Sequence, residues 1–212
     1  MTEQFTPTEK TKLRRIPKRG VYEREKIYQI LDEGFICHVG FTDGGKTFVI
    51  PTGYARLEDK LLIHGSSASR MMREMAQKIE VCVTVTLLDG LVLARSAFHH
   101  SMNYRSVIIF GTAHLITDAK EKYDALKAFT EHIIPNRWTD IRPPNDLELK
   151  ATTVLSLPIE EASAKIRNGD PVDDEADYSL SVWAGVVPLK MERGQSIRDA
   201  RLNSDIEMPD YL

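Results

Sequence analysis

A short run of glycine, serine and arginine residues predicts a site for an anionic group. Residues 64–70 read His-Gly-Ser-Ser-Ala-Ser-Arg; they follow a strand-like apolar stretch at 60–63 and precede a helix-like stretch at 71–75. The start of a helix presents unpaired N–H groups, serine hydroxyls donate hydrogen bonds, and arginine carries a permanent positive charge. We therefore predict that Ser66, Ser69 and Arg70 bind a phosphate group. A capped helix with an exposed arginine is the alternative interpretation.

Histidines supply the second kind of chemistry that the sequence offers. His64 lies at the end of the strand-like stretch, beside the predicted phosphate turn. An imidazole titrates near neutrality and could give a proton to a reduced substrate, or it could only contact or hydrogen-bond a ligand. His99 and His100 are adjacent, but no further ligands occur at a suitable spacing, so we expect a pair of loop side chains and no metal site.

These residues lie in a segment that alternates strands and turns. Six stretches of strand length fall between residues 34 and 117 with hairpin-type turns between them, at 34–41, 47–54, 61–64, 79–86, 87–96 and 106–116. This density of strands predicts an antiparallel barrel or sandwich. Together with the helices predicted in the next paragraph, it gives a mainly β fold of the α+β class.

Helices are predicted on both sides of this β-rich segment. A short amphipathic helix is expected within 22–33, and a longer one at 119–133, with Asp118 as its cap and Tyr123, Leu126, Phe129 and Ile133 on one face. A further strand is expected at 151–157, a helix or loop at 160–167, and a last apolar segment at 182–189. We divide the chain into a basic, solvated arm at 1–20, a domain at 21–190 and a tail at 191–212 that frays or packs on a partner subunit.

Composition excludes several classes of protein. The 212 residues are 42% hydrophobic and 28% charged, which suits one globular domain, and the net charge of −3 disfavours nucleic acid as a partner. The apolar runs have the length of strands and the N-terminus is polar, so we expect neither membrane insertion nor secretion. Cys37 and Cys82 lie in apolar runs, where small thiols are usually buried and reduced, and this points to the cytoplasm.

Four segments together resemble one protein family. The segments 47–54 (Thr-Phe-Val-Ile-Pro-Thr-Gly-Tyr), 63–70, 103–107 (Asn-Tyr-Arg-Ser-Val) and 183–186 (Trp-Ala-Gly-Val) occur in the order found in the pyridoxamine 5'-phosphate oxidase-like flavoproteins. Among these proteins the chain is most similar to the branch of the nitroimidazole resistance reductases. The resemblance covers roughly residues 15–189 and implies an FMN-binding split β-barrel that forms a homodimer, with two flavin sites at the subunit interface.

The resemblance also implies which residues bind the cofactor. These residues lie on the segments that border the flavin in this family, which are a strand, a turn and a long hairpin. They are Val49, Ile50, Pro51, Thr52, Tyr54, Ile63, His64, Gly65, Ser66, Ser69, Arg70, Tyr104, Arg105, Ser106 and Trp183. Pro51 removes one backbone donor and so favours a strand edge, where backbone groups are free to meet a ligand. Tyr54 and Trp183 could instead be core side chains, and Arg105 could bind the phosphate or form a surface ion pair.

The function implied is an FMN-dependent oxidoreductase. A reduced nicotinamide (NADH or NADPH) or another donor would reduce the flavin, and a small acceptor would take the electrons. The oxidase's own activity is not expected, because the characteristic arginine- and histidine-bearing C-terminus of that enzyme is missing. Two alternatives stay open: a protein that stores flavin without turnover, and a haem-binding or haem-degrading relative in which His64 or His99 ligates iron.

Overall fold

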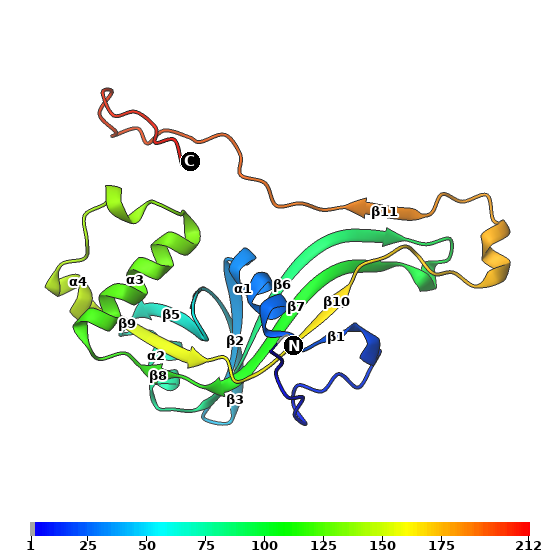
Figure 1. The fold of residues 1–212 in the computed structure, drawn as a ribbon, viewed down its shortest axis with the longest axis horizontal. Coiled ribbons are helices and arrows are strands. Elements are labelled where there is room, and N and C mark those ends of the chain that lie inside the picture. The colour runs from blue at the N-terminus through cyan, green and yellow to red at the C-terminus, as the bar shows by residue number, and fades with distance from the viewer. Residues whose placement is uncertain (1–2) are drawn as a thin grey trace.

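The computed structural model describes residues 3–212 (Figure 1). Within these residues, two antiparallel sheets that do not close on each other form the framework of the protein. The larger sheet has the order β1-β10-β7-β6-β2-β3, and β11 pairs with β6. Its strands are β1 (Gly20–Val21), β2 (Ile36–Asp43), β3 (Lys46–Gly53), β6 (Glu80–Leu93), β7 (Ser101–Thr112), β10 (Glu161–Arg167) and β11 (Gly185–Pro188). The smaller sheet has the order β4-β5-β9-β8. Its strands are β4 (Ala55–Leu57), β5 (Lys60–Ser66), β8 (His114–Leu115) and β9 (Thr152–Pro158). The predicted antiparallel split barrel is thereby confirmed.

The hairpin of β2 and β3 places β3 at one edge of the larger sheet. Gly44 and Gly45 form its turn with φ of 55° and 75°, a left-handed conformation that glycine adopts at little cost. The register then runs from Asp43 opposite Lys46 to Ile36 opposite Gly53. Because β3 is bonded only to β2, its second edge is free of other strands among residues 3–212.

Within residues 3–212, four α-helices accompany the sheets: α1 (Arg24–Glu33), α2 (Arg70–Ala76), α3 (Ala119–Ile133) and α4 (Asp146–Ala151). The predicted cap of α3 is present, since the Asp118 side chain accepts a hydrogen bond from the Glu121 N–H at 2.9 Å. Asn145 and Glu148 form a reciprocal capping box at the start of α4. Four short 3₁₀ turns occur at η1 (Pro17–Arg19), η2 (Ala97–His99), η3 (Trp138–Asp140) and η4 (Glu175–Ser179).

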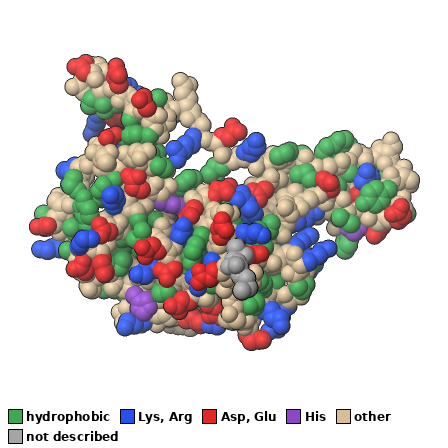
Figure 2. All heavy atoms as spheres, in the orientation of Figure 1, with side chains coloured by type: hydrophobic (Ala, Val, Ile, Leu, Met, Phe, Trp, Pro, Cys, Tyr) green, Lys and Arg blue, Asp and Glu red, His purple; other side chains and the backbone are tan. Residues whose placement is uncertain are grey.

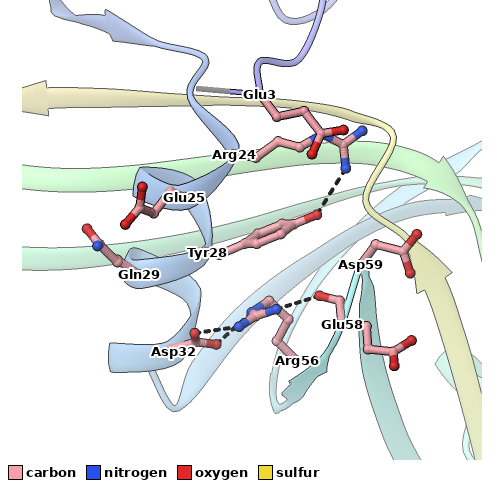
Figure 3. Close-up of a pocket in the computed structure, with 9 residues that line it drawn as sticks. All are labelled: Glu3, Arg24, Glu25, Tyr28, Gln29, Asp32, Arg56, Glu58 and Asp59. Carbon is pink, nitrogen blue, oxygen red and sulfur yellow. Dashed lines mark hydrogen bonds and ion pairs between the residues drawn. The ribbon is translucent and has the colours of Figure 1, made fainter. Parts of the chain in front are cut away.

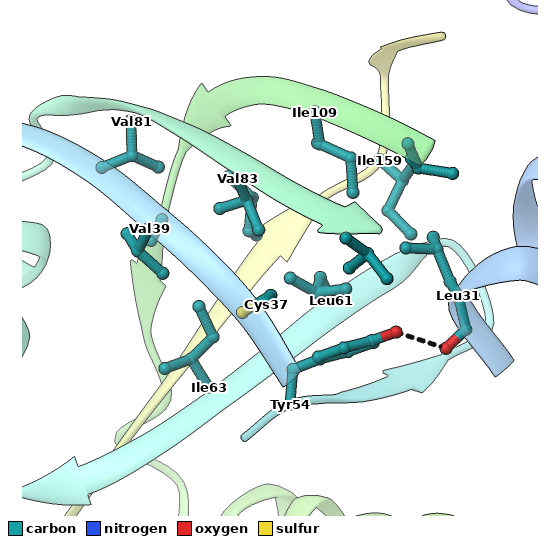
Figure 4. Close-up of a cluster of buried hydrophobic side chains, with 14 of the residues drawn as sticks. Leu31, Cys37, Val39, Tyr54, Leu61, Ile63, Val81, Val83, Ile109 and Ile159 are labelled. Atoms are coloured by element: carbon teal, nitrogen blue, oxygen red, sulfur yellow. Dashed lines mark hydrogen bonds between the residues drawn. The ribbon is translucent and has the colours of Figure 1, made fainter. Parts of the chain in front are cut away.

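The main core lies between the two sheets and under α1 and α2 (Figure 4). Alternate side chains of the strands point into it, as the period of two along a strand requires. Figure 4 shows Cys37 and Val39 from β2 facing Leu61 and Ile63 from β5, with Leu31 of α1 at the end of the cluster. Burial raises the pKa of the Cys37 thiol to about 12, so this side chain behaves as a small apolar group.

An arm extends from this body (Figure 1). We define the arm as the distal part of the β6–β7 hairpin, together with η2, η4 and β11, and its tip as residues 96–102 and 172–183. Figure 2 shows hydrophobic side chains on its surface. Phe98 is 90% exposed and Trp183 is 66% exposed. After β11, residues 189–212 form no helix or strand and run back towards α3, where Arg193 donates to the Ile133 carbonyl.

The structure corrects several predicted elements. Residues 161–167 are strand β10, neither a helix nor a loop, and the strands expected at 79–86 and 87–96 are one strand, β6. The strand expected at 106–116 begins at Ser101 as β7. Ile133 is exposed, so the buried face of α3 depends on Ala125 and Phe129.

The N-terminal segment packs on the body more closely than a solvated arm would. Phe5 and Thr11 are buried, and the Thr8 hydroxyl donates to the Glu161 carboxylate. Most basic side chains of the segment, including Lys12 and Arg15, are nevertheless exposed, as the arm interpretation expects.

Candidate functional site

Arg70 joins two of the predicted site segments. It is the first residue of α2, and its guanidinium carbon lies 5.0 Å from the centre of the Phe48 ring on β3. Its Nε atom is 3.9 Å from the Asp43 carboxylate, which is too long for a hydrogen bond. The side chain is 58% exposed. The predicted phosphate turn and the predicted ring-binding strand are therefore neighbours, and a cation without a close carboxylate partner lies between them.

The turn before Arg70 is held by its backbone. The Ser69 N–H donates to the Ser66 carbonyl at 2.9 Å, and the Ala68 N–H donates to the Ser66 hydroxyl oxygen at 3.2 Å. The Ser69 hydroxyl does not cap α2, and Met71, Met72 and Met75 anchor the helix in the core. A Cβ atom at Gly65 would lie 3.1 Å from Met72, so glycine allows β5 to approach the helix. The Ser69 hydroxyl is thus left to bind a ligand, and the Ser66 hydroxyl, which accepts one hydrogen bond, can still donate its own O–H.

Strand β3 offers an exposed apolar edge. Val49 is 61% exposed, and Ile50 and Pro51 are also exposed, while Thr52 is half-buried. An unpaired strand edge presents free backbone N–H and C=O groups, and such an edge invites either a ligand or another chain. The position of Pro51 on this edge agrees with the expectation from the sequence. Apolar surface beside free backbone groups matches the face and the polar rim of a flat heteroaromatic ring.

His64 lies on β5, next to the turn. Its ring packs edge-on against Phe129 of α3, with 4.2 Å between the ring centres. One side of the imidazole remains exposed, and desolvation on the other side lowers its pKa from the ordinary value. Its neutral form, with one unprotonated nitrogen, is therefore favoured at neutral pH. This form can accept a proton or ligate a metal, and the protonated form is the less favoured one.

Two predicted residues have their side chains in the core. Tyr54 is buried and its hydroxyl donates to the Leu31 carbonyl at 2.6 Å, as Figure 4 shows, and Ile63 is fully buried. Burial raises the pKa of the Tyr54 hydroxyl far above its ordinary value. Of the two interpretations given for Tyr54, the core position is the one observed. At both positions only backbone atoms remain for a ligand.

The segment 104–106 lies apart from Arg70 within one chain. Strands β6 and β2 separate β7 from β3 in the sheet, and strands are spaced by about 4.8 Å. Arg105 donates to Asp89 at 2.9 and 2.7 Å and to Glu33, and these carboxylates raise its pKa. It is thus engaged in an ion pair, the second of its two interpretations. The Ser106 hydroxyl donates to the Lys165 carbonyl at 3.4 Å, and Tyr104 pairs with Arg167 of β10. Trp183 lies on the arm and is exposed, which excludes the core alternative given for it.

The other histidines lie at the arm tip. The His99 Nε2 atom is 3.5 Å from the Asp174 carboxylate, and the His100 Nδ1 atom is 2.8 Å from the Ser96 carbonyl oxygen. Within residues 3–212, no group of three or more His, Cys, Asp and Glu side chains is arranged to hold a metal ion.

A cavity of about 620 Å³ lies elsewhere, between α1 and the β4–β5 turn (Figure 3). Its two arginines have partners on the protein. Arg56 donates to the Asp32 carboxylate at 2.7 and 2.6 Å, and Arg24 donates to the Tyr28 hydroxyl at 3.2 Å. Figure 3 shows these contacts crossing the cavity. Arg56 is paired with a carboxylate, whereas the buried Arg24 Nε has no hydrogen-bond partner among residues 3–212, and no predicted site residue lines the cavity.

Phe48 and Phe129 were not among the predicted site residues. Phe48 lies under Arg70 and Phe129 supports His64. The helical periodicity did predict that Phe129 faces inward, but which strand it would meet depends on the tertiary fold.

Comparison with known proteins identifies the family. The sequence profile described as pyridoxamine 5'-phosphate oxidase matches residues 23–166, most of the chain. The chain belongs to the pyridoxamine 5'-phosphate oxidase family. No curated protein matches this family member at a significant level. No α-helix in residues 3–212 has the length and apolar character needed to cross a lipid bilayer.

Solved structures agree with this family assignment. The flavocytochrome Anf3 from Azotobacter vinelandii is 40% identical with a TM-score of 0.91, and the match covers 97% of this chain and 96% of that one. The FAD and haem binding protein from Mycobacterium smegmatis is 34% identical with a TM-score of 0.88, covering 91% and 95%. A putative 5-nitroimidazole antibiotic resistance protein from Bacteroides thetaiotaomicron is 24% identical with a TM-score of 0.59, covering 69% and 86%, and shares the fold.

Proposed function

We propose that this protein is a flavin-binding oxidoreductase that passes electrons from NADH, NADPH or another donor to a small acceptor. One observation carries the proposal: Arg70, an exposed arginine that makes no hydrogen bond to the Asp43 carboxylate 3.9 Å away, lies over Phe48 beside the free edge of β3. Family membership and the similarity to the flavin-binding proteins named above support it.

The residues present fit two parts of a flavin nucleotide, its phosphate and its ring. The phosphate needs a cation and hydroxyl donors, which Arg70, Ser66 and Ser69 supply. The ring needs an apolar surface with polar backbone groups at its rim, and the stretch Val49–Thr52 on β3 supplies both. A bound flavin supplies the electron transfer itself, because it accepts a hydride and can return its electrons to an acceptor.

The other roles fall to residues of the chain. Arg70 and the serines orient the phosphate, and β3 excludes water from one side of the ring. His64 stands beside the phosphate turn and is held neutral by its contact with Phe129. A neutral imidazole can keep a hydrogen bond to an acceptor or relay a proton through its exposed nitrogen once it has been protonated from solvent.

A homodimer belongs to the same proposal. Tyr104, Arg105, Ser106 and Trp183 are predicted flavin contacts, yet β6 and β2 separate β7 from β3 within one chain, and Trp183 lies on the arm. A second copy would bring its arm to the β3 edge and complete the site. The exposed apolar side chains of both surfaces, such as Val49 and Phe98, support this arrangement. The two unpaired cysteines suit a reducing compartment, and we place the protein in the cytoplasm.

We propose FMN as the flavin, with FAD as the competing ligand. The turn at 66–70 offers one arginine and three serine hydroxyls, which match one terminal phosphate. The Mycobacterium smegmatis relative is described as an FAD and haem binding protein, so FAD has to be measured beside FMN. The flavin-free protein is titrated with each nucleotide in turn, and quenching of the flavin fluorescence on binding gives the two dissociation constants. Tighter binding of FAD than of FMN would replace FMN in the proposal.

The proposal is tested with Arg70→Ala. This variant should weaken FMN binding by about 1.5–3 kcal/mol, because a charge-assisted phosphate contact is lost. Arg73→Ala is the matched control, since Arg73 is an exposed arginine on the same helix and should leave binding unchanged. Equal FMN affinities of the two variants would mean that the turn at 66–70 does not bind the phosphate. Anaerobic addition of NADH or NADPH should bleach the flavin absorbance, whereas a flavin-storage protein would stay yellow.

A second candidate function is that of a flavocytochrome, which binds haem as well as flavin. Two relatives that cover more than nine-tenths of this chain, one named a flavocytochrome and the other an FAD and haem binding protein, favour it. The exposed, neutral His64 has the protonation state of an iron ligand. Haem added to the protein should give a Soret band that His64→Ala abolishes and His99→Ala retains. Loss of the band in His99→Ala instead would move the ligand to the arm tip.

A further inference from the structure

A second cluster of cations lies where the arm joins the body. Lys18, Arg19 and Arg167 line a cavity of about 360 Å³, together with the loop 168–172 that leaves β10. The strand register explains why these basic side chains lie close together. Gly20 of β1 pairs with Lys165 of β10, so the residues before Gly20 run beside those after Lys165.

Arg167 is a built part of this cavity. The residue is 9% exposed, and its guanidinium donates to the Asn103 side-chain oxygen, to the Gly169 carbonyl at 3.0 Å and to the Asp170 carbonyl at 3.1 Å. Asn103 fixes the loop in turn, since its amide donates to the Gly169 carbonyl at 3.1 Å and its oxygen accepts from the Gly169 N–H at 3.1 Å. These contacts use three of the five guanidinium N–H groups.

None of the three cations has an anionic partner. Every acceptor of Arg167 is a neutral oxygen, and within residues 3–212 no carboxylate lies within 4.0 Å of a charged nitrogen of Lys18, Arg19 or Arg167. Asp170 also lines the cavity, so the three cations and this one carboxylate give its lining residues a net charge of +2. Burial, and next the charge of Arg19, lower the pKa of Arg167, which agrees with an excess of positive charge. In the cavity of Figure 3, by contrast, arginine and carboxylate are paired.

We propose that this cavity binds a small oxyanion carrying two negative charges, such as a phosphate group or a dicarboxylate. A buried arginine held by neutral acceptors keeps its full charge for a ligand, and Lys18 and Arg19 add two positive charges to the same cavity. Within one chain the cavity is separate from the Arg70 end of the proposed flavin site, because β1 and β3 are at opposite edges of the larger sheet. Arg167 pairs with Tyr104, a predicted flavin contact, so competition with FMN and FAD is part of the test.

The proposal is tested by titrating the full-length protein with inorganic phosphate and with sulfate in calorimetry. One ion should bind per chain once FMN or FAD fills the proposed site at Arg70. The double variant Lys18→Gln/Arg19→Gln should weaken binding at least about tenfold, and Asp170→Asn should strengthen it by several-fold, because a repulsive charge is removed. The gain in Asp170→Asn separates the proposal from a loss of folding. Chloride, with one charge, should bind at least about tenfold more weakly than sulfate.

The matched control is Lys12→Gln/Arg15→Gln, which removes two exposed charges from the same N-terminal segment outside the cavity. It should leave phosphate binding unchanged. If both double variants weakened phosphate binding equally, the effect would come from the overall positive charge of the N-terminal segment and not from this cavity, and the proposal would be overturned. Loss of the phosphate ion when FMN or FAD is added would assign the cavity to the flavin and would overturn it as well. Retention of phosphate by the flavin-loaded protein is the expected result.

Discussion

Leu61 and Ile63 in the body are fully buried between two sheets, whereas Phe98 and Trp183 at the arm tip are 90% and 66% exposed. Both regions are rich in apolar side chains. In the body each strand has a sheet or a helix over its inner face. At the tip the long hairpin of β6 and β7 has left the body and nothing in residues 3–212 covers these side chains. Apolar residues in the body therefore stabilise the chain itself, and those on the arm are available to a second molecule.

The largest difference should appear when one leucine of each region is truncated. Leu61→Ala should lower the free energy of unfolding by about 2–5 kcal/mol, because it leaves a cavity between the sheets. Leu180→Ala, at the arm tip, should change it by no more than about 0.5 kcal/mol at low protein concentration. Chemical denaturation of both variants measures the two values. Similar losses would mean that the arm is part of the same cooperative core.

One glycine of the body and one glycine of the tail give a second comparison. A Cβ atom at Gly34 would lie 2.6 Å from the Tyr54 hydroxyl and 2.8 Å from Val85, whereas one at Gly194 in the tail would meet nothing within 4 Å. Gly34→Ala should therefore destabilise the protein by about 1–3 kcal/mol through overpacking. Gly194→Ala should have no measurable effect. A Gly34→Ala variant with an unchanged melting temperature would show that the body can yield at this point.

The two regions also differ in how far the sequence predicted them. The body follows from local patterns: the Gly44–Gly45 turn fixes the β2–β3 hairpin, and Asp118 fixes the start of α3. Strand β10 was missed because its run Glu-Ala-Ser-Ala-Lys-Ile-Arg has little β-branched or aromatic content, and its pairing with β7 decides its conformation. The path of the arm depends on contacts far apart in sequence, such as that of Arg95 with Asp173.

The same distinction holds for the candidate site. Ser66, Ser69 and Arg70 are close in sequence, so their grouping was predictable from local structure. The position of Arg70 over Phe48 was not, because it depends on how α2 meets the β2–β3 hairpin. Arg105 could not be assigned from sequence, since its partners Glu33 and Asp89 belong to two distant elements. Lys18 and Arg19 became informative only once β1 was seen to pair with β10.

Polar substitutions at the arm tip test the proposed dimer. The combined change Phe98→Ser/Trp183→Ser should weaken self-association by about tenfold or more, because two large apolar side chains lose their burial. FMN binding should weaken with it if the partner completes the site. Ile197→Ser is the control, since Ile197 is an exposed apolar residue of the tail. Sedimentation over a range of concentrations measures the change. A dimer of unaltered strength would place the interface elsewhere.

The smallest expected effect concerns His64, which belongs to the body. Its pKa is lowered by burial in the folded chain and returns to about 6.5 on unfolding. The unfolded chain therefore binds this proton more readily, and the folded protein loses stability as the pH falls from about 6.5 towards the lower, folded pKa. Above about pH 6.5 both states are neutral and the group contributes no pH dependence.

His64→Gln should remove this part of the acid sensitivity. The fall in melting temperature between about pH 7.5 and about pH 5.5 should be smaller in the variant than in the parent protein. His100→Gln, at the arm tip, is the control and should keep the parent's fall. An identical fall in all three proteins would mean that the contact of His64 with Phe129 does not favour the neutral imidazole, and the proposed role of His64 as a neutral hydrogen-bonding or iron-binding group would lose its physical basis.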